Sequence, residues 1–206
     1  TKRDQAKIVW GEAARMVAAT PGLQARIESR EGSLLIRATA SVFKPLASED
    51  HAEEGLNIHG AIVDELHAHR TAEMVNVLKT ATWARRQPLL LYITTAGVDR
   101  HTICWETRER AVKVLQRVFE ANELFAYVAT IDEDDWRDEA CWPKANPNLG
   151  VSVKIETLRE SCREAMQSPG QQNPFRRRHL DVWTEQVDRW LDLAQWDRGA
   201  EPFDID

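Results

Sequence analysis

The sequence predicts an α/β fold in which a doubly wound, mostly parallel sheet is followed by a small helical subdomain. Residues 59–65 and 88–97 each begin as a short apolar run typical of a buried strand. An amphipathic helix is expected between them at residues 71–86, so the three elements form a βαβ unit with parallel strands. An expected helix at 102–121 and a further apolar run at 124–131 continue the alternation, which is the pattern of a doubly wound sheet.

Upstream of this unit, the sequence predicts one helix and a pair of strands. Apolar residues recur at helical spacing from the start of the chain until Pro21, which stops the helix. Residues 25–30 and 34–43 are then expected as the two strands of a hairpin. The turn between them contains Gly32, which can adopt the positive φ that a tight hairpin turn requires.

The composition of the chain changes near residue 141. Residues 142–150 are dense in Pro, Asn and Gly, as in a loop, and two helices are expected beyond them, at about 152–167 and 173–185. Ser152 is the expected N-cap of the first of these helices. We therefore predict an α/β domain over residues 1–141 and a helical subdomain over residues 142–206.

Composition restricts the function classes that need to be considered. With a net charge of −6, any contact with nucleic acid requires a local basic surface. The three cysteines are scattered without metal-ligand spacing, which favours reduced thiols in a cytosolic protein. No apolar run approaches the roughly 18 residues of a membrane-spanning helix, so no membrane association is expected. The chain opens at Thr1 without a methionine, and we expect it to be a fragment.

Two adjacent carboxylates follow the first strand of the βαβ unit. An apolar strand ending in Asp-Glu is typical of the second nucleotide-binding motif of P-loop ATPases, and the expected fold is of that type. In this interpretation Asp64 holds Mg²⁺, and Glu65 orients and deprotonates the water that attacks the γ-phosphate of ATP. The alternative is that the two carboxylates only cap the following helix.

The second strand ends in small hydroxyls and a glycine. In a parallel sheet, ligands collect at the carboxyl ends of the strands, where Asp64 and Glu65 are also expected. Thr94, Thr95 and Gly97 are therefore candidates to lie near the γ-phosphate and respond to its loss. The alternative is a simple turn in which threonine and glycine end a strand.

The phosphate-binding loop of P-loop ATPases is missing from the sequence. No Gly-x-x-x-x-Gly-Lys-Ser/Thr motif occurs in the 206 residues. We therefore expect the isolated chain to bind ATP poorly. If it is an ATPase, the loop lies upstream of Thr1, and residues 1–141 are an ATPase domain that lacks its N-terminal part.

Two other charged stretches have functional and structural interpretations. Residues 132–135, with Asp138 and Glu139, could form a carboxylate site for metal-dependent phosphodiester cleavage, but a solvated acidic loop that caps a helix is favoured. Residues 175–179 contain three arginines that could contact DNA phosphates, and a solvated helix face explains them equally well.

The chain resembles the large terminase subunit of tailed bacteriophages, the motor that packages viral genomes. The resemblance runs nearly end to end, and the order and spacing of its matching stretches are specific. These stretches are Thr1–Ala6, Gly60–Leu66, Tyr92–Gly97, Trp142–Gly150 and Trp183–Trp196.

The resemblance implies roles for the strand-end residues. Asp64 would bind Mg²⁺, Glu65 would be the catalytic carboxylate, and Thr94–Gly97 would couple hydrolysis to DNA movement. Residues from about 142 to 196 would be the linker subdomain, with the RNase H-like nuclease beginning beyond Asp206. The family also uses an arginine from a neighbouring subunit, and the sequence does not decide among candidates such as Arg3, Arg37 and Arg70.

The implied partners are those of a packaging motor. They are double-stranded viral DNA, the portal protein, the small terminase subunit and further copies in a ring on the procapsid, in the cytoplasm of the bacterial host. Two alternatives remain open: a helicase-like P-loop ATPase that acts on nucleic acid without packaging, and a catalytically silent structural or binding remnant of a prophage protein.

Overall fold

The computed structural model describes residues 3–46, 55–69, 71–131 and 133–184, with only the backbone for residues 3–5. The chain divides into two compact units, Thr1–Ile93 and Thr94–Asp206, and each is described by itself. The expected exit segment beyond Trp190 lies outside the described residues.

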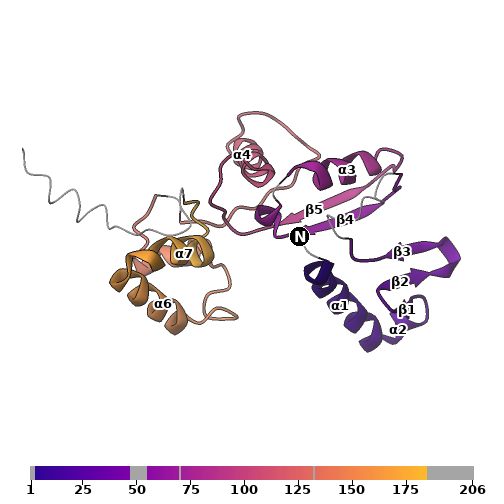
Figure 1. Cartoon of the computed structure of the whole chain (residues 1–206), viewed down its shortest axis with the longest axis horizontal. Coiled ribbons are helices and arrows are strands. Elements are labelled where there is room, and N and C mark those ends of the chain that lie inside the picture. The colour runs from indigo at the N-terminus through magenta and orange to yellow at the C-terminus, as the bar shows by residue number, and fades with distance from the viewer. Residues whose placement is uncertain (1–2, 47–54, 70, 132, 185–206) are drawn as a thin grey trace, which may run out of the picture. The chain divides into compact units, whose positions relative to one another are not determined.

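The first unit begins with helices and a small antiparallel sheet (Figure 1). Pro21 ends the first helix as predicted, but it also begins the next one, because proline is well accommodated in the first turn of a helix. A three-stranded sheet in the order β1-β2-β3 follows. These elements are α1 (Arg3–Ala19), α2 (Pro21–Gln24), β1 (Glu28–Arg30), β2 (Ser33–Ile36) and β3 (Ser41–Phe43).

The hairpin turn is confirmed, but the predicted strand at 34–43 is wrong. Gly32 has a φ of 71° in the turn between β1 and β2, as expected. The chain then turns again through a short 3₁₀ helix, η1 (Arg37–Thr39), and β3 folds back antiparallel onto β2. Ala40, with φ 51°, completes this second turn. The sequence signals no break there, because the turn contains neither Gly nor Pro.

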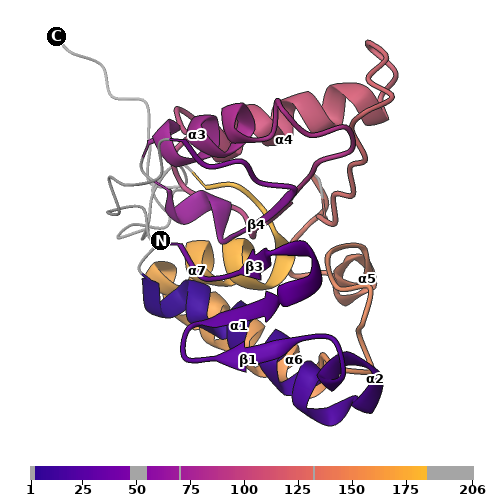
Figure 2. The ribbon, with the colours of Figure 1, turned by 90° about the vertical axis from the view of Figure 1, so that its right-hand side faces the viewer.

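The βαβ unit is confirmed. β4 (Gly60–Asp64) and β5 (Leu89–Ile93) pair in parallel, with Asp64 opposite Ile93. The crossover between them contains η3 (Leu66–Ala68) and α3 (Glu73–Ala81), which lies alongside the strands in both views (Figures 1 and 2). One sheet face is less exposed than the other and includes the buried Val63, and α3 buries its Val75 and Leu78. The other sheet face, which includes Ile62 and Leu91, is exposed.

In the second unit, α4 is shorter than predicted. It spans Ile103–Leu115 and is capped by Thr102, whose hydroxyl accepts a hydrogen bond from the Trp105 amide. The helix ends before the expected residue 121, and Arg117 adopts a φ of 58°. Helical periodicity over the expected range 102–121 predicts an inward face of four apolar residues, but the first is half-buried and the other three are exposed. They are Val112, Leu115, Val118 and Phe119.

The predicted strand at 124–131 is also wrong. No strand is present there, and the parallel sheet among the described residues has two strands. Phe125 is 91% exposed and Tyr127 is 71% exposed, whereas Ile131 is buried in the core of the C-terminal helices. An apolar run forms a strand only when a neighbouring strand supplies hydrogen-bonding partners, and composition does not reveal that neighbour.

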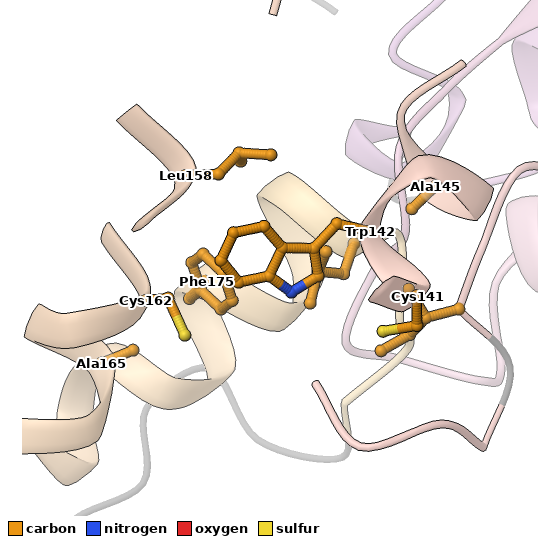
Figure 3. Close-up of a cluster of buried hydrophobic side chains, with 9 residues drawn as sticks. Cys141, Trp142, Ala145, Leu158, Cys162, Ala165 and Phe175 are labelled. Carbon is orange, nitrogen blue, oxygen red and sulfur yellow. The ribbon is translucent and has the colours of Figure 1, made fainter. Parts of the chain in front are cut away.

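The C-terminal helices enclose a cluster of buried hydrophobic side chains (Figure 3). Trp142 is at its centre, with its indole N–H donating to the Trp136 carbonyl at 3.0 Å. α6 ends at Gln167 as predicted, but Ser152 is not its cap, because the helix begins at Ile155 after an extended Lys154. The helices are η4 (Glu139–Cys141), α5 (Trp142–Ala145), α6 (Ile155–Gln167) and α7 (Pro169–Leu180).

No helix among the described residues has both the length and the apolar character needed to cross a membrane.

Candidate functional site

Asp64 is the last residue of β4, at the carboxyl end of the parallel strand pair. It pairs with Ile93, the last residue of β5, so both strands end at the same level. Its side chain is half-buried, and its Oδ1 accepts a hydrogen bond from the amide of Glu65 at 3.0 Å. The strand therefore delivers a carboxylate to the edge of the sheet where ligands of parallel α/β folds collect.

Glu65 adopts a backbone conformation that is unusual for its residue type. Its φ of 53° and ψ of 52° place it in the left-handed region, directly before η3. Non-glycine residues pay a steric cost there and are enriched at functional sites. Its side chain makes no capping hydrogen bond to η3, and α3 begins at Glu73 after an N-cap residue, Ala72, that supplies no side-chain cap. The alternative that Asp64 and Glu65 only cap the following helix is therefore not what the structure shows.

The Glu65 carboxylate is partly desolvated. Its Oε2 is buried and has no hydrogen-bond partner among the described residues. His67 Nδ1 lies 3.1 Å from this oxygen, close enough for an ion pair although not aligned as a hydrogen bond. A buried carboxylate oxygen without a donor is costly to the folded state, and such atoms call for a functional explanation.

His69 is a buried residue near these carboxylates, and the sequence did not single it out. Its side chain is 7% exposed, and burial lowers its pKa, against a hydrogen bond with the Asp64 backbone that raises it. Its Nε2 has no hydrogen-bond partner among the described residues. Histidine spacing alone gives no sign of this burial, because burial depends on how the folded chain packs around the side chain.

The Thr94–Gly97 loop opens the second unit. The Thr94 hydroxyl donates to the Thr95 carbonyl at 2.9 Å, and Cys104 Sγ lies 3.6 Å from it. Thr94 and Thr95 are exposed, whereas Ala96 and Gly97 are buried. The loop thus presents its hydroxyl residues outward and anchors its small residues.

A carboxylate from the end of α7 holds this loop. Asp181 Oδ1 accepts a hydrogen bond from the Ala96 amide at 3.2 Å, and the Thr184 amide donates to the Gly97 carbonyl at 3.4 Å. Burial raises the pKa of Asp181 to about 6, against the Ala96 hydrogen bond, which lowers it. No local pattern predicts this contact, because Asp181 and Ala96 are 85 residues apart.

The candidate residues belong to both units of the chain. Asp64 and Glu65 lie in the first unit, and Thr94, Thr95 and Gly97 lie in the second. Thr94 follows Ile93 directly in the chain.

The acidic segment is occupied by structural contacts. Asp138 caps η4 by accepting from the Ala140 amide, as the favoured interpretation predicts. Asp135 is bidentate with Arg137, which lowers the pKa of its carboxyl group. Within the part of the chain that the structure describes, no three His, Cys, Asp or Glu side chains are grouped to hold a metal ion.

The described arginines leave the trans arginine undecided. Arg37 Nε donates to Glu28 at 2.6 Å within the first hairpin. The side chains of Arg3 and Arg70 lie outside the described residues.

Asp64 suits a magnesium ion in the chemistry of its ligand. Mg²⁺ prefers oxygen donors and is commonly bound by one or two carboxylates together with substrate phosphates and water. Asp64 supplies such a carboxylate at the strand end, and the carboxylate of Glu65 is the next acidic group along the chain. The residues therefore fit a site completed by nucleotide phosphates.

Comparison with known protein families decides the identity of the chain at family level. The model of the ATPase domain of the terminase large subunit matches residues 1–113, more than half of the chain. The chain belongs to the terminase large subunit family. The model of the endonuclease domain of the same family matches residues 119–205, a range in which the sequence predicts the end of the ATPase domain and a linker.

Two similar proteins support this assignment. Protein YmfN of Escherichia coli (strain K12) is 37% identical over 144 residues, which is 69% of this chain and 32% of that protein. The crystal structure of the HK97 bacteriophage large terminase matches with a TM-score of 0.77 and 25% identity, over 88% of this chain and 38% of that one.

This terminase chain spans about a third of the length of both relatives. Its α/β architecture with a parallel sheet matches that of the HK97 large terminase, which confirms the predicted fold class. The division into an ATPase domain over residues 1–141 and a linker subdomain over 142–206 stays a prediction.

Proposed function

We propose that this terminase chain serves an ATP-hydrolysing motor that moves double-stranded viral DNA into procapsids. The observation that carries the proposal is Glu65, in a left-handed conformation directly after β4, whose buried Oε2 lies 3.1 Å from His67 and has no hydrogen-bond donor among the described residues. It lies within the range that matches the ATPase-domain family model. Backbone strain and an acceptor oxygen without a hydrogen bond, at the same residue, are expected for a carboxylate that acts as a general base.

In this mechanism Glu65 is the general base. Its carboxylate orients the attacking water and accepts its proton as the γ-phosphate is transferred. Asp64 would hold Mg²⁺, which when bound would supply positive charge to neutralise the phosphate oxygens. His67 lies near Glu65 Oε2 and helps to hold the side chain in place.

Thr94, Thr95 and Gly97 couple hydrolysis to movement. β4 and β5 end at the same level, so the loop that follows β5 emerges at the edge that carries Asp64. Thr94 and Thr95 are exposed, and the Thr95 hydroxyl is suited to donate to a phosphate oxygen. The Thr94 hydroxyl would do so only after it leaves the Thr95 carbonyl.

The partners follow from membership of the family. The motor acts as a ring of subunits on the portal protein of the procapsid, receives DNA with the small terminase subunit, and works in the cytoplasm of the bacterial host. We expect the nuclease activity of the family from a domain beyond this chain, although the endonuclease-domain model also matches residues 119–205. Asp135 and Glu139 of the acidic segment form ion pairs with Arg137 and Arg159.

The test is ATP turnover by the full-length gene product, with Glu65→Gln against wild type, in the presence and absence of DNA. Glutamine keeps the shape of the side chain but does not accept the proton. We expect kcat to fall by roughly 10²-fold or more with nucleotide binding retained.

Glu73→Gln is the matched control, because Glu73 is an exposed glutamate in the first turn of α3. It should leave turnover unchanged. Equal turnover of wild type and Glu65→Gln would refute the catalytic role and favour the silent-remnant alternative. ATP turnover that DNA stimulates but portal protein does not would favour the helicase-like alternative.

A further inference from the structure

The segment that follows α7 lies against the Thr94–Gly97 loop. Two hydrogen bonds join them: the Ala96 amide donates to Asp181 Oδ1 at 3.2 Å, and the Thr184 amide donates to the Gly97 carbonyl at 3.4 Å. We call residues 181–184 the strap. Both bonds lie within the second unit, and they fix the buried half of the loop.

An aromatic contact also holds the strap in place, and its strap residue lies between the two hydrogen-bonding residues in sequence. Trp183 of the strap packs edge-on against Trp105 of α4, with ring centroids 4.9 Å apart and an interplanar angle of 73°. The guanidinium groups of Arg100 and Arg108 lie 5.0 and 5.2 Å from the centre of the Trp105 ring. Edge-on aromatic and cation–π contacts depend on orientation, so these contacts fix the orientation of the strap against α4.

The end of α7 is built to direct Asp181 toward the loop. Asp181 has a φ of 52°. Its backbone amide and that of Val182 both donate hydrogen bonds to the carbonyl of Arg176. The Asn146 side chain binds the His179 carbonyl at 2.8 Å, which fixes the last turn further. A left-handed helix end is usually glycine, so an aspartate there is explained by a use for its side chain.

We propose that Asp181 is a positioning residue, which holds the Thr94–Gly97 loop to the end of α7 so that loop and helix move together. This inference rests on the coupling role proposed above for the loop. A change in the loop on phosphate loss then reaches α7 directly through the strap. Asp181 itself does not touch the nucleotide.

The test compares Asp181→Ala with Asp181→Asn in the full-length gene product. Alanine removes the acceptor for the Ala96 amide, and asparagine retains a carbonyl oxygen at the same place. Asp138→Ala is the matched control, since Asp138 also accepts from a backbone amide but lies at η4, in no hydrogen bond with the loop. Two readouts are taken: hydrogen exchange of residues 94–98, and DNA packaged per ATP hydrolysed together with the KM for ATP.

We expect Asp181→Ala to exchange the Ala96 amide roughly tenfold or more faster and to package several-fold less DNA per ATP, with KM unchanged. Asp181→Asn and Asp138→Ala should behave as wild type in both readouts. Unchanged exchange in Asp181→Ala, or an equal loss in Asp181→Asn, would overturn the inference.

The two proposals can fail separately. If the wild-type protein shows no DNA-dependent ATP turnover, the motor proposal fails. The exchange experiment still decides whether Asp181 positions the loop, because it requires no catalysis.

Discussion

At the scale of single residues, two carboxylates at positive φ distinguish the candidate site. The four non-glycine residues with positive φ among the described residues are Ala40, Glu65, Arg117 and Asp181. Ala40 and Arg117 follow short turns or helix ends without further contacts of note. Glu65 and Asp181 instead combine strain with a partly buried carboxylate, which is the pattern expected where strain serves a function.

The raised pKa of Asp181 predicts a pH-dependent stability. A pKa raised to about 6 in the folded state means that folding favours the protonated form. The contribution of Asp181 to the free energy of unfolding therefore falls as pH rises from about 4 to about 6. Asp181→Asn should be more stable than wild type at pH 8 by about 1–2 kcal/mol, after allowance for partial solvent screening.

Denaturant unfolding of the two proteins at pH 4 and pH 8 measures this effect. The difference between them isolates Asp181 from other carboxylates, such as Asp135, whose pKa is lowered and whose contribution has the opposite sign. A stability difference that is the same at both pH values would contradict the prediction.

At the scale of elements, the C-terminal helices pack around one core with aromatic side chains at its centre. α4 is stabilised mainly by contacts in its first turn. Trp142 packs against Phe175 of α7, with ring centroids 6.2 Å apart, and Leu158 of α6 is fully buried in the same cluster. α4 has one fully buried side chain, that of Cys104, and the Thr102 cap. A substitution in the core should therefore destabilise the C-terminal helices, whereas removal of the N-cap should destabilise α4.

Replacing Trp142 with alanine should be strongly destabilising. The side chain is 2% exposed, and its loss leaves a large cavity and the Trp136 carbonyl without its donor. We expect a loss of about 3–5 kcal/mol in the free energy of unfolding, measured by denaturant titration. Trp83→Ala, at a residue that is 80% exposed, is the control and should change stability by less than about 0.5 kcal/mol.

Removing the α4 cap should have a smaller and local effect. Thr102→Ala leaves the Trp105 amide without its acceptor and should cost about 1 kcal/mol. Thr102→Ser keeps the hydroxyl and should retain most of the stability that Thr102→Ala loses. Hydrogen exchange in the first turn of α4 checks the location, and protection unchanged in Thr102→Ala would argue against the cap.

At the scale of the whole molecule, the parallel sheet exposes an apolar face. Ile62, Leu89, Leu91 and Ile93 are each more than 40% exposed, and strand alternation places them on one side of β4 and β5. Parallel sheets are normally covered on both faces. The 206-residue chain studied alone should therefore bind hydrophobic dyes and self-associate.

Leu91→Lys should reduce that behaviour. A charge in the middle of the exposed face lowers its attraction for other apolar surfaces while leaving the opposite face intact. Light scattering and dye binding should fall, with the circular dichroism spectrum unchanged. Val63→Lys, on the buried face, is the contrasting control and should unfold the sheet. Unfolding by Leu91→Lys as well would mean that this face is covered in solution.

The sequence alone determined the features that depend on local patterns. The βαβ unit, the end of the first helix at Pro21 and the turn at Gly32 follow from periodicity and from the backbone preferences of Pro and Gly. The position of Asp64 at a strand end follows from the same patterns. The resemblance to terminase large subunits rests on ordered short stretches and is confirmed by the family match over residues 1–113.

Tertiary structure decided what depends on distant partners. The run at 124–131 is apolar enough for a strand but has no neighbouring strand, and Phe125 is left exposed. Glu65 Oε2 is buried by the tertiary fold, and among the described residues it has His67 Nδ1 at 3.1 Å but no hydrogen-bond donor. The contact between Asp181 and Ala96 joins residues 85 positions apart. The local conformational preferences of residues do not predict such contacts, because the contacts form only when packing brings distant segments of the chain together.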